Sequence, residues 1–555
     1  VTASITGYQG AGGAVTVPEI VEEAAVTEIA GYAFSGCSTI TSVALPTTLT
    51  SLGESAFRGC QNLGEITLPE GITELKAALF DGCTSLKSIL LPDKLTSIQS
   101  SVFSGCSSLA SIVVPDGVTQ IGSSAFSGCK SLTEIDLPDQ ITVLPANTFV
   151  NCTELATVDL PANLITIERS AFDGCSKLAD IVIPDGVTEI GMEAFRRCRS
   201  LTEIALPEGL AEIKDSTFSS CSSLLSVSLP SSLRKIGYNA FVSCSALSEL
   251  ILPEGLTEIS SGAFTSCESL TEIVLPSSLT LIDTNMFSGC SALAAVSILG
   301  EVTEIRSYAF LGCTSLTSIN FPETLRTIGS SAFTNCTSLA EVSLPWGMET
   351  LGDHAFSGCA NLRIAVLPFS ITSIGESAFH SCDNVTLIVD PDSYAEQYAI
   401  EQELSYQYSL SSGNDAVVQL SGNEPARFQG LLLTLTYGEN TVSQRITGSS
   451  EYRFYDLPAG ESLKAAVTND YGDVLASKEN LSVEPGETLI LLDEFLATED
   501  LSAVVYDSSS KDVTDQVSIT WTDPDGNPYA SGPSLKQVPA GKELSMEVSL
   551  KEALK

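Results

Sequence analysis

The chain of 555 residues has 26 lysine and arginine side chains against 68 aspartates and glutamates, which gives a formal net charge of −42. Nucleic acid and anionic membrane surfaces are therefore disfavoured as partners, because both are bound through clustered basic side chains and we identify no such cluster. No apolar run approaches the roughly 18 residues of a transmembrane helix, and the length indicates more than one domain.

The first residues contain neither an initiator methionine nor the apolar leader of an export signal. The sequence opens at Val1 with "VTASITGYQG". This opening fits a mature or trimmed chain from which an export signal has been removed.

A 23-residue repeat dominates the chain from its first cysteine to about residue 395. All sixteen cysteines, from Cys37 to Cys382, are spaced by 23 residues, and a phenylalanine stands three positions before each of them. Counted from the cysteine, large aliphatic residues recur at +3, +6, +8, +12 and +15, and proline occupies +9 in every copy except the one with Leu299. A fixed period of this length indicates a solenoid whose coils stack on their neighbours.

Each coil is predicted to have two strand-like sides and one turned side. Positions +6 and +8 alternate with mostly polar or small residues, and +12 and +15 lie on a second short extended stretch. Between them, copies such as Pro69-Glu70-Gly71 predict a type I turn with proline at its second position. The segment from Ala-Phe to the cysteine is expected to be a helical or 3₁₀ turn, and Ala365 at +6 suggests a shifted register in its coil.

The cysteines are predicted to form an inward-facing column of free thiols. Coils about 4.8 Å apart would let each thiol, a small apolar group and a weak donor, meet a loop carbonyl. Disulfides between neighbouring coils are permitted by the spacing and the even count, but side chains that point the same way have the wrong mutual orientation. A metal column is disfavoured, since CxxC spacing is absent and the only histidines are His354 and His380.

The consensus CxxLxxIxLPxxLxxIGxxAFxx resembles the 23-residue leucine-rich repeat of the BspA-like family of bacterial surface proteins. The resemblance covers about residues 26–395, and "NVTLIVDPDSYAEQYAIEQELSYQY" is similar to the family's closing cap. It implies an extracellular or surface-anchored protein of a host-associated bacterium, with adhesion and matrix-protein binding described for some members. Because free thiols also suit a reducing cytosol, the expected compartment rests on this resemblance.

The period ends after Tyr408, and residues 411–415 read as a linker. The strand-like runs that follow are typical of small β-sandwich domains of the immunoglobulin-like or transthyretin-like kind. "LPAGESL" at 457–463 recurs as "VPAGKEL" at 538–544, which suggests a second copy.

We therefore predict a mainly β chain of four parts. Residues 1–395 form the leucine-rich-repeat solenoid of about sixteen coils with an N-terminal cap, 396–412 the C-terminal cap and linker, 413–495 a β-sandwich domain, and 496–555 a second, truncated one.

Acidic side chains in neighbouring coils are the first candidates for chemistry. Glu249 and Glu272 are neighbours at +5. Four successive coils have an acid at +10: Glu70, Asp93, Asp116 and Asp139. Carboxylates about 5 Å apart occur in retaining glycosidases and cation sites, but solvated acids on an exposed turn are the better interpretation. Glu249 and Glu272 are kept as candidate binding residues.

Catalysis is not predicted. A serine or cysteine nucleophile needs a histidine held by two partners, whereas His354 and His380 occupy different repeat positions and are expected to be exposed. Cys382 is near His380 in sequence, but its repeat position predicts a buried thiol. "DPDGN" at 523–527 reads as a hairpin turn, since a calcium loop would need further acids. We predict no catalytic residue, cofactor or metal ligand.

Trp346 and Phe369 interrupt the pattern at +10, which is otherwise mostly Asp, Glu, Ser or Thr. They fall in consecutive coils, and exposed aromatic side chains often anchor contact surfaces. Packing against the cap or the first β-sandwich is the favoured alternative, and both residues are kept as candidate binding residues.

The sequence thus predicts a non-enzymatic, secreted or cell-surface binding and adhesion protein. Its solenoid would contact extracellular protein partners, such as host matrix proteins, through exposed side chains at +5, +7, +13 and +14. The alternative is a carbohydrate-binding or surface-carrier module that uses the C-terminal β-sandwich domains. Glycan binding needs aromatic stacking faces, which the solenoid lacks outside Trp346 and Phe369.

Overall fold

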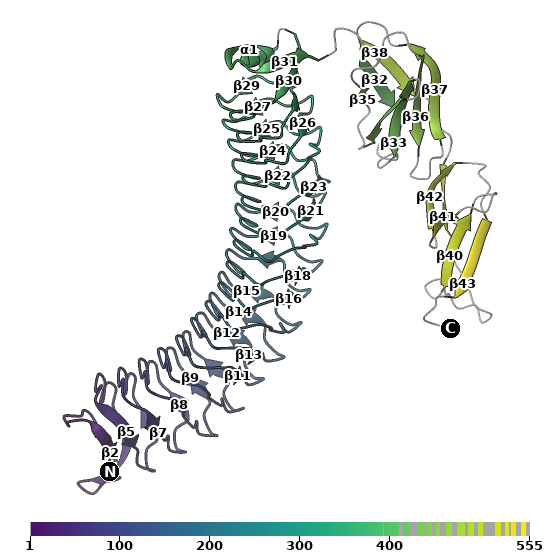
Figure 1. The fold of residues 1–555 in the computed structure, drawn as a ribbon. Coiled ribbons are helices and arrows are strands. Elements are labelled where there is room, and N and C mark those ends of the chain that lie inside the picture. The colour runs from purple at the N-terminus through teal and green to yellow at the C-terminus, as the bar shows by residue number, and fades with distance from the viewer. Residues whose placement is uncertain are drawn as a thin grey trace. The chain divides into compact units, whose positions relative to one another are not determined.

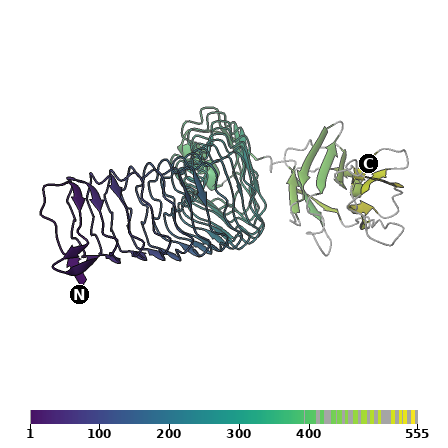
Figure 2. The same cartoon turned by 90° about the horizontal axis from the view of Figure 1, so that it is seen from below.

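The computed structural model describes residues 2–391 and 393–409 and, beyond these, Leu431, Ile446 and the strands between residues 415 and 550. The chain divides into two compact units, Val1–Gln407 and Tyr408–Lys555. The first unit is a solenoid that bends along its length (Figure 1), and a second view shows its coils as a stack of similar loops (Figure 2). We number the coils from their cysteines, so that coil 1 contains Cys37 and coil 16 contains Cys382.

Two columns of short parallel strands run along the solenoid, which confirms the prediction of two strand-like sides for most coils. Within residues 2–391, the first column has no strand in coils 3, 4, 7, 10 and 13. Residues in successive strands of a column are 23 apart, as Glu134 and Thr157 are in one column and Thr166 and Glu189 in the other. The first column, around +5 to +7, consists of β2 (Gly13–Thr16), β5 (Ile40–Ala44), β7 (Glu65–Ile66), β11 (Glu134–Asp136), β13 (Thr157–Asp159), β16 (Glu203–Ala205), β18 (Ser226–Ser228), β21 (Glu272–Leu275), β23 (Ala295–Ile298), β26 (Glu341–Ser343), β28 (Ile364–Val366) and β30 (Thr386–Val389).

The second column, at +14 and +15, begins with a longer strand and continues with pairs of residues. It consists of β4 (Ala24–Ile29), β6 (Ser51–Leu52), β8 (Glu74–Leu75), β9 (Ser97–Ile98), β10 (Gln120–Ile121), β12 (Val143–Leu144), β14 (Thr166–Ile167), β15 (Glu189–Ile190), β17 (Glu212–Ile213), β19 (Lys235–Ile236), β20 (Glu258–Ile259), β22 (Leu281–Ile282), β24 (Glu304–Ile305), β25 (Thr327–Ile328), β27 (Thr350–Leu351) and β29 (Ser373–Ile374). At its start, β1 (Thr2–Ile5) pairs with β4 in parallel and β3 (Ile20–Val21) pairs with it antiparallel.

The interior of the solenoid is a continuous apolar core built from the aliphatic repeat positions and the phenylalanines. Successive phenylalanine rings, from Phe34 to Phe379, have centroids 5.0–5.8 Å apart and planes inclined by 5–17°. Each offset-stacked pair contributes about 0.5–1.5 kcal/mol beyond the burial of its surface. Because this contact exists only between coils, it stabilises the stack and not the single coil.

The sixteen cysteines form the predicted inward column of free thiols. Fifteen are buried, and only Cys37 at the first coil is partly exposed. From coil 2 onwards each sulfur donates a hydrogen bond to the phenylalanine carbonyl of the preceding coil, as Cys60 does to Phe34 at 3.1 Å and Cys198 to Phe172 at 3.3 Å. The free-thiol prediction is confirmed, and so is the carbonyl partner.

The segment before each cysteine is a pair of tight turns, and the prediction of a helical or 3₁₀ turn was wrong. A backbone N–H closes the turn onto the carbonyl three residues earlier, as from Cys37 to Phe34 at 3.1 Å. However, the residue just before the cysteine is left-handed in all sixteen coils, and the one four positions earlier in nearly all. Left-handed residues interrupt the consecutive right-handed dihedrals that a helix needs.

Two finer predictions of register were also wrong. Ile72 donates its N–H to the Pro69 carbonyl at 3.1 Å, so proline is the first residue of its turn and not the second; the first position needs only a carbonyl, which proline has. Ala365 is fully buried and pairs with Val342 at the usual offset. The register shifts one coil later, where Thr386 pairs with Ile364. The pairing of Ala365 is set by the strands stacked on either side of it, and the hydrophobicity of the residues next to it in sequence does not change that pairing.

Aromatic side chains cover both ends of the phenylalanine column. The Tyr8 ring lies 5.4 Å from Phe34, and the Tyr398 ring lies 6.4 Å from Phe379. Tyr398 belongs to α1 (Tyr394–Glu401), whose N-cap Ser393 accepts a hydrogen bond from the Glu396 N–H. After α1, β31 (Ser405–Tyr408) joins β30 at the edge of its sheet. These caps shield the apolar ends that a solenoid would otherwise expose.

The second unit consists of β-strands, as the alternating runs predict. Its strands are β32 (Asp415–Leu420), β33 (Leu432–Tyr437), β34 (Asn440–Arg445), β35 (Glu451–Phe454), β36 (Ser462–Thr468), β37 (Val474–Ser482), β38 (Glu487–Leu492), β39 (Thr498–Ser502), β40 (Val517–Thr522), β41 (Pro528–Ser531), β42 (Ser534–Pro539) and β43 (Ser545–Leu550). The sheets β35-β32-β38 and β34-β33-β36-β37 are followed by β39-β42 and β41-β40-β43.

The later sheets repeat the pairing of β32 with β35 and of β33 with β34 and β36, as expected of a second copy. The domain boundaries at 395, 412 and 495 stay predictions. The turn at 523–527, and all but the last residue of the linker at 411–415, lie outside the described residues.

We expect thiol reagents to reach no more than the two ends of the cysteine column in the native protein. Burial blocks access and also raises the pKa of most of the thiols, for example that of Cys60 to about 12. Titration with a chromogenic disulfide should count sixteen thiols after denaturation without reductant and at most two before it. Eight cysteine pairs that survive denaturation would contradict the free-thiol column.

Candidate binding surface

The structure brings the four predicted site residues together in two separate pairs. Glu249 and Glu272 are exposed at +5 of coils 10 and 11, whose backbones are joined by a hydrogen bond from the Thr271 N–H to the Ser248 carbonyl at 3.5 Å. Trp346 and Phe369 are 40 % and 56 % exposed at +10 of coils 14 and 15. The two pairs lie at different positions of different coils, so they do not form one site.

Trp346 and Phe369 lie on two turns that are tied to their neighbours. Glu323, at the same position one coil earlier, accepts a hydrogen bond from the Trp346 main-chain N–H. The Ser370 hydroxyl donates to the Met348 carbonyl at 2.6 Å, which connects coil 15 to coil 14. The backbone of this turn row is therefore held in place while the aromatic rings remain accessible.

Glu249 and Glu272 belong to a larger surface that we call the long-strand face, defined as the side chains at +5 and +7 of coils 1 to 15. No lysine or arginine occupies either position. Nine exposed acids do: Glu65, Glu134, Asp136, Asp159, Asp180, Glu203, Glu249, Glu272 and Glu341. In the described part of the chain none of these nine carboxylates forms an ion pair.

The same face also exposes aliphatic side chains that the sequence analysis did not single out. Five of them stand at +7: Leu90 (73 % exposed), Val113 (78 %), Val182 (77 %), Ile251 (87 %) and Val274 (50 %). The sixth, Ile364, stands at +5 of coil 15 and is 42 % exposed. A signal in the sequence could have found them, because +6 to +8 then reads as three aliphatics in a row, as in Leu250-Ile251-Leu252. The alternation of a half-buried strand fails there, and the middle residue faces solvent.

Several charges on and beside the second strand column are paired. Lys235 lies between Glu212 and Glu258, with N···O distances of 3.7 and 3.1 Å. Arg306 contacts both Glu304, at 3.3 Å, and Asp283, at 3.1 Å. Positive charge is therefore available on this face of the solenoid and absent from the long-strand face.

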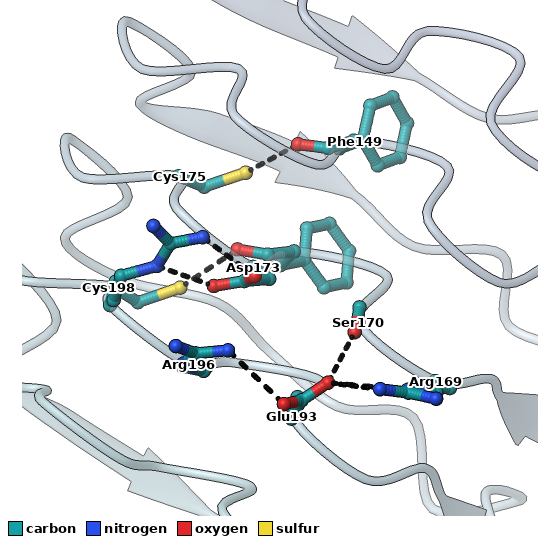
Figure 3. Close-up of polar contacts among 10 residues, drawn as sticks. Phe149, Arg169, Ser170, Asp173, Cys175, Glu193, Arg196 and Cys198 are labelled. Atoms are coloured by element: carbon teal, nitrogen blue, oxygen red, sulfur yellow. Dashed lines mark hydrogen bonds and ion pairs between the residues drawn. The ribbon is translucent and has the colours of Figure 1, made fainter.

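Coils 7 and 8 contain a network of ion pairs on the turned side (Figure 3). Asp173 is 6 % exposed and accepts two hydrogen bonds from the Arg197 guanidinium, at 2.9 and 2.7 Å. Glu193 accepts from Arg169 at 2.9 Å and from Arg196 at 3.1 Å. These arginines do cluster in space, contrary to the sequence analysis, but the two acids hold three of them, so the group is best explained as structural.

The two histidines lie at different repeat positions, and the thiol nearest to one of them in sequence, Cys382, is buried and hydrogen-bonded. His354 and His380 are exposed, as predicted, at different repeat positions. Cys382 is 5 % exposed and donates to the Phe356 carbonyl at 3.1 Å. Among the described residues no three His, Cys, Asp or Glu side chains are arranged to hold a metal ion.

Two cavities lie on the solenoid, away from both pairs of predicted residues. One of about 290 Å³ separates coil 16 from α1 and is lined by His380, Cys382 and Tyr398 among others. The other, of about 550 Å³, lies on the second strand column and is lined mainly by neutral residues such as Gln99 and Gln120.

The repeat matches the model of one protein family, described as "BspA type Leucine rich repeat region". The model matches in six copies, over residues 27–156, 75–199, 165–294 and 291–405. The chain belongs to this family. A search of curated proteins found no match, and no helix among the described residues is long and apolar enough to span a membrane.

Solved structures of bacterial leucine-rich-repeat proteins are similar to this chain. One from Bacteroides ovatus is 29 % identical, with 71 % of this chain and 91 % of that chain covered and a TM-score of 0.50. A leucine-rich cell surface protein from Faecalibacterium prausnitzii is 26 % identical, with 72 % and 93 % covered and a TM-score of 0.37. The pneumococcal vaccine antigen PcpA is 16 % identical, with 73 % and 91 % covered and a TM-score of 0.34.

Replacing Glu193 by Gln should lower stability at neutral pH and not in acid. Burial acts to raise the pKa of Glu193, but hydrogen bonds from Arg169 and Ser170 and the nearby arginine charges outweigh it, so the pKa is lowered. A lowered pKa stabilises the fold above the unfolded pKa, and this contribution is lost as pH falls through the folded pKa. Thermal unfolding at pH 7 should show a loss of about 1 kcal/mol.

The control is Glu203→Gln, which removes an exposed acid on the long-strand face of the same coil that has no ion pair, and which should leave the transition unchanged. An equal loss for Glu193→Gln at pH 7 and at pH 3 would show that packing, and not the charge of Glu193, is responsible.

Proposed function

We propose that the protein is a non-enzymatic binding scaffold that acts outside the cell or on its surface and contacts protein partners through the outside of its solenoid. The observation that carries this proposal is that each coil is divided into buried core positions and exposed outer positions. The thiol, the phenylalanine and the aliphatic residues are buried, whereas the repeat positions at +5 and +7 present unpaired acids and exposed aliphatics over many coils. Membership of the BspA-type family supports the surface location.

Absence of enzymatic activity is part of the proposal. The buried thiols of coils 2 to 16 are used as hydrogen-bond donors to carbonyls, and burial raises the pKa of most of them. A nucleophile needs an accessible thiolate or a base in contact with it, and the described residues of the solenoid offer no such pair at either histidine.

Two groups of residues are proposed as contact sites. Glu249 and Glu272 would act on the long-strand face, where charge sets the orientation and rate of encounter. Trp346 and Phe369 would act on the turn row, where exposed aromatic rings supply contact area. We further propose that the second unit forms immunoglobulin-like β-sandwich spacers. The carbohydrate-binding alternative for these domains falls mostly on side chains outside the described residues.

Binding assays with purified protein separate the two functional readings. The full chain should bind immobilised extracellular matrix proteins in a concentration-dependent manner, measured by surface plasmon resonance. A glycan panel forms the second arm. Binding to glycans alone would replace the protein-binding scaffold by the carbohydrate-binding alternative.

Replacing Trp346 and Phe369 by serine together should weaken that protein binding roughly tenfold, since exposed aromatic anchors are typical hot spots. The melting temperature of the solenoid should stay the same. Tyr238→Ser, which removes an aromatic side chain that is 52 % exposed on the turned side, is the matched control. A large fall in melting temperature for the double variant would assign the two rings to packing instead.

A further inference from the structure

The aliphatic side chains at +7 form an ordered series along the long-strand face. Leu90 and Val113 are in adjacent coils, and so are Ile251 and Val274. Val182 is three coils from Val113 and three coils from Ile251. With coils about 4.8 Å apart, the series spans about 38 Å between Leu90 and Val274.

These side chains are exposed although the chain segments around them are held in place by buried neighbours. The residues on either side of Ile251, Leu250 and Leu252, are buried at 7 % and 8 % exposure. At Leu90 the backbone itself is paired, since Leu90 forms a parallel bridge with Thr67 of the preceding coil. Because the buried side chains on either side fix the segment, the +7 side chain cannot turn inward, and it presents apolar surface to water at a cost that a partner could remove.

The chemistry between these side chains favours one kind of partner. Glu249 is two residues before Ile251 and Glu272 is two residues before Val274, so each acid projects on the same side of its strand as an aliphatic group. Asp136 and Asp159 occupy +7 between Val113 and Val182. Unpaired carboxylates that alternate with aliphatic groups are complementary to cationic side chains that alternate with aliphatic ones.

Other occupants fit less well. A second copy of this chain would place carboxylates against carboxylates, and nucleic acid has the same sign of charge. Addition of a strand by backbone hydrogen bonds is not available at the face, because backbone groups there already bond to the neighbouring coils, as the Ala294 N–H does to the Thr271 carbonyl at 2.9 Å.

We propose that the long-strand face binds an extended, cationic protein segment in which lysine or arginine alternates with aliphatic residues. The aliphatic side chains of the segment would cover the +7 series, and its cations would pair with the acids at +5 and +7. This inference rests on the proposed function as a protein-binding scaffold and names the class of partner for one of its faces.

A synthetic peptide can stand in for this segment. A labelled peptide of twelve alternating lysine and leucine residues spans about 40 Å when extended, which matches the +7 series. In fluorescence anisotropy with the full chain it should bind, and a lysine–serine peptide should bind at least tenfold more weakly. A glutamate–leucine peptide should not bind. Equal binding of the two lysine peptides would overturn the aliphatic part of the proposal.

Variants locate the site. Ile251→Ser with Val274→Ser should weaken binding of the lysine–leucine peptide roughly tenfold or more, because two aliphatic contacts are lost. Ile165→Ser with Leu299→Ser, which removes aliphatic groups that are 49 % and 53 % exposed away from +5 and +7, should leave it unchanged. Circular dichroism must show the same unfolding transition for both pairs of variants.

A matched pair tests the charges. Glu249→Gln with Glu272→Gln should weaken binding several-fold, and the effect should shrink as salt is raised. Glu70→Gln with Asp93→Asn removes the same charge from the +10 turns and should have little effect. Equal losses for both pairs would mean a general attraction to a chain of net charge −42 and would overturn the proposal.

Labelling of carboxylates with a carbodiimide completes the test. The bound lysine–leucine peptide should protect Glu249 and Glu272 and leave Glu70 reactive. If the peptide protects no residue of the long-strand face while the full chain still binds matrix proteins, this inference fails and the proposed scaffold function stands. If the peptide protects the long-strand face but the full chain does not bind matrix proteins, this inference stands and the proposed binding to matrix proteins fails.

Discussion

The solenoid depends on one acceptor in each coil, the main-chain carbonyl of the phenylalanine. In coil 1 the Phe34 carbonyl accepts the Cys37 N–H at 3.1 Å, which closes the turn, and the Cys60 thiol at 3.1 Å, which joins the next coil. A carbonyl has two lone pairs, and both are used inside an apolar core where an unsatisfied group would be costly. The cysteine is therefore a packing residue and a donor at once, and a disulfide would break the contact that fixes the spacing.

Once the spacing between coils is fixed, the side chains at each other repeat position also lie in a column along the solenoid. The left-handed residue before each cysteine is glycine in nine coils and Asn, Ser or Arg in the others, so the turned side pays a conformational cost that the stacked rings and ladders offset. Arg197 occupies this position with φ of 60°, and its two hydrogen bonds to buried Asp173 hold it there. The left-handed backbone is tolerated at these positions because contacts with the coils on both sides hold it in that conformation.

The columns differ in what they offer to a partner. The second strand column and the residues beside it pair several charges with one another, whereas the long-strand face leaves its acids without ion pairs and exposes aliphatic side chains between them. The two strand columns share a core but differ chemically on the outside. The proposed binding surface uses positions that the fold does not need, because the core requires only the inward side chains.

The sequence by itself determined the period, the inward aliphatics, the free thiols and the strand columns, since each is written sixteen times and strict spacing leaves little freedom in the stack. It could not determine which way the turns close, because left-handed residues such as Ser55 and Arg197 have no local signature. Nor could it show that Ile251 faces solvent between two buried leucines, or that Glu249 and Glu272 have no basic neighbour. Those properties depend on what adjacent coils place beside a residue, and only tertiary structure decides contacts between residues 23 positions apart.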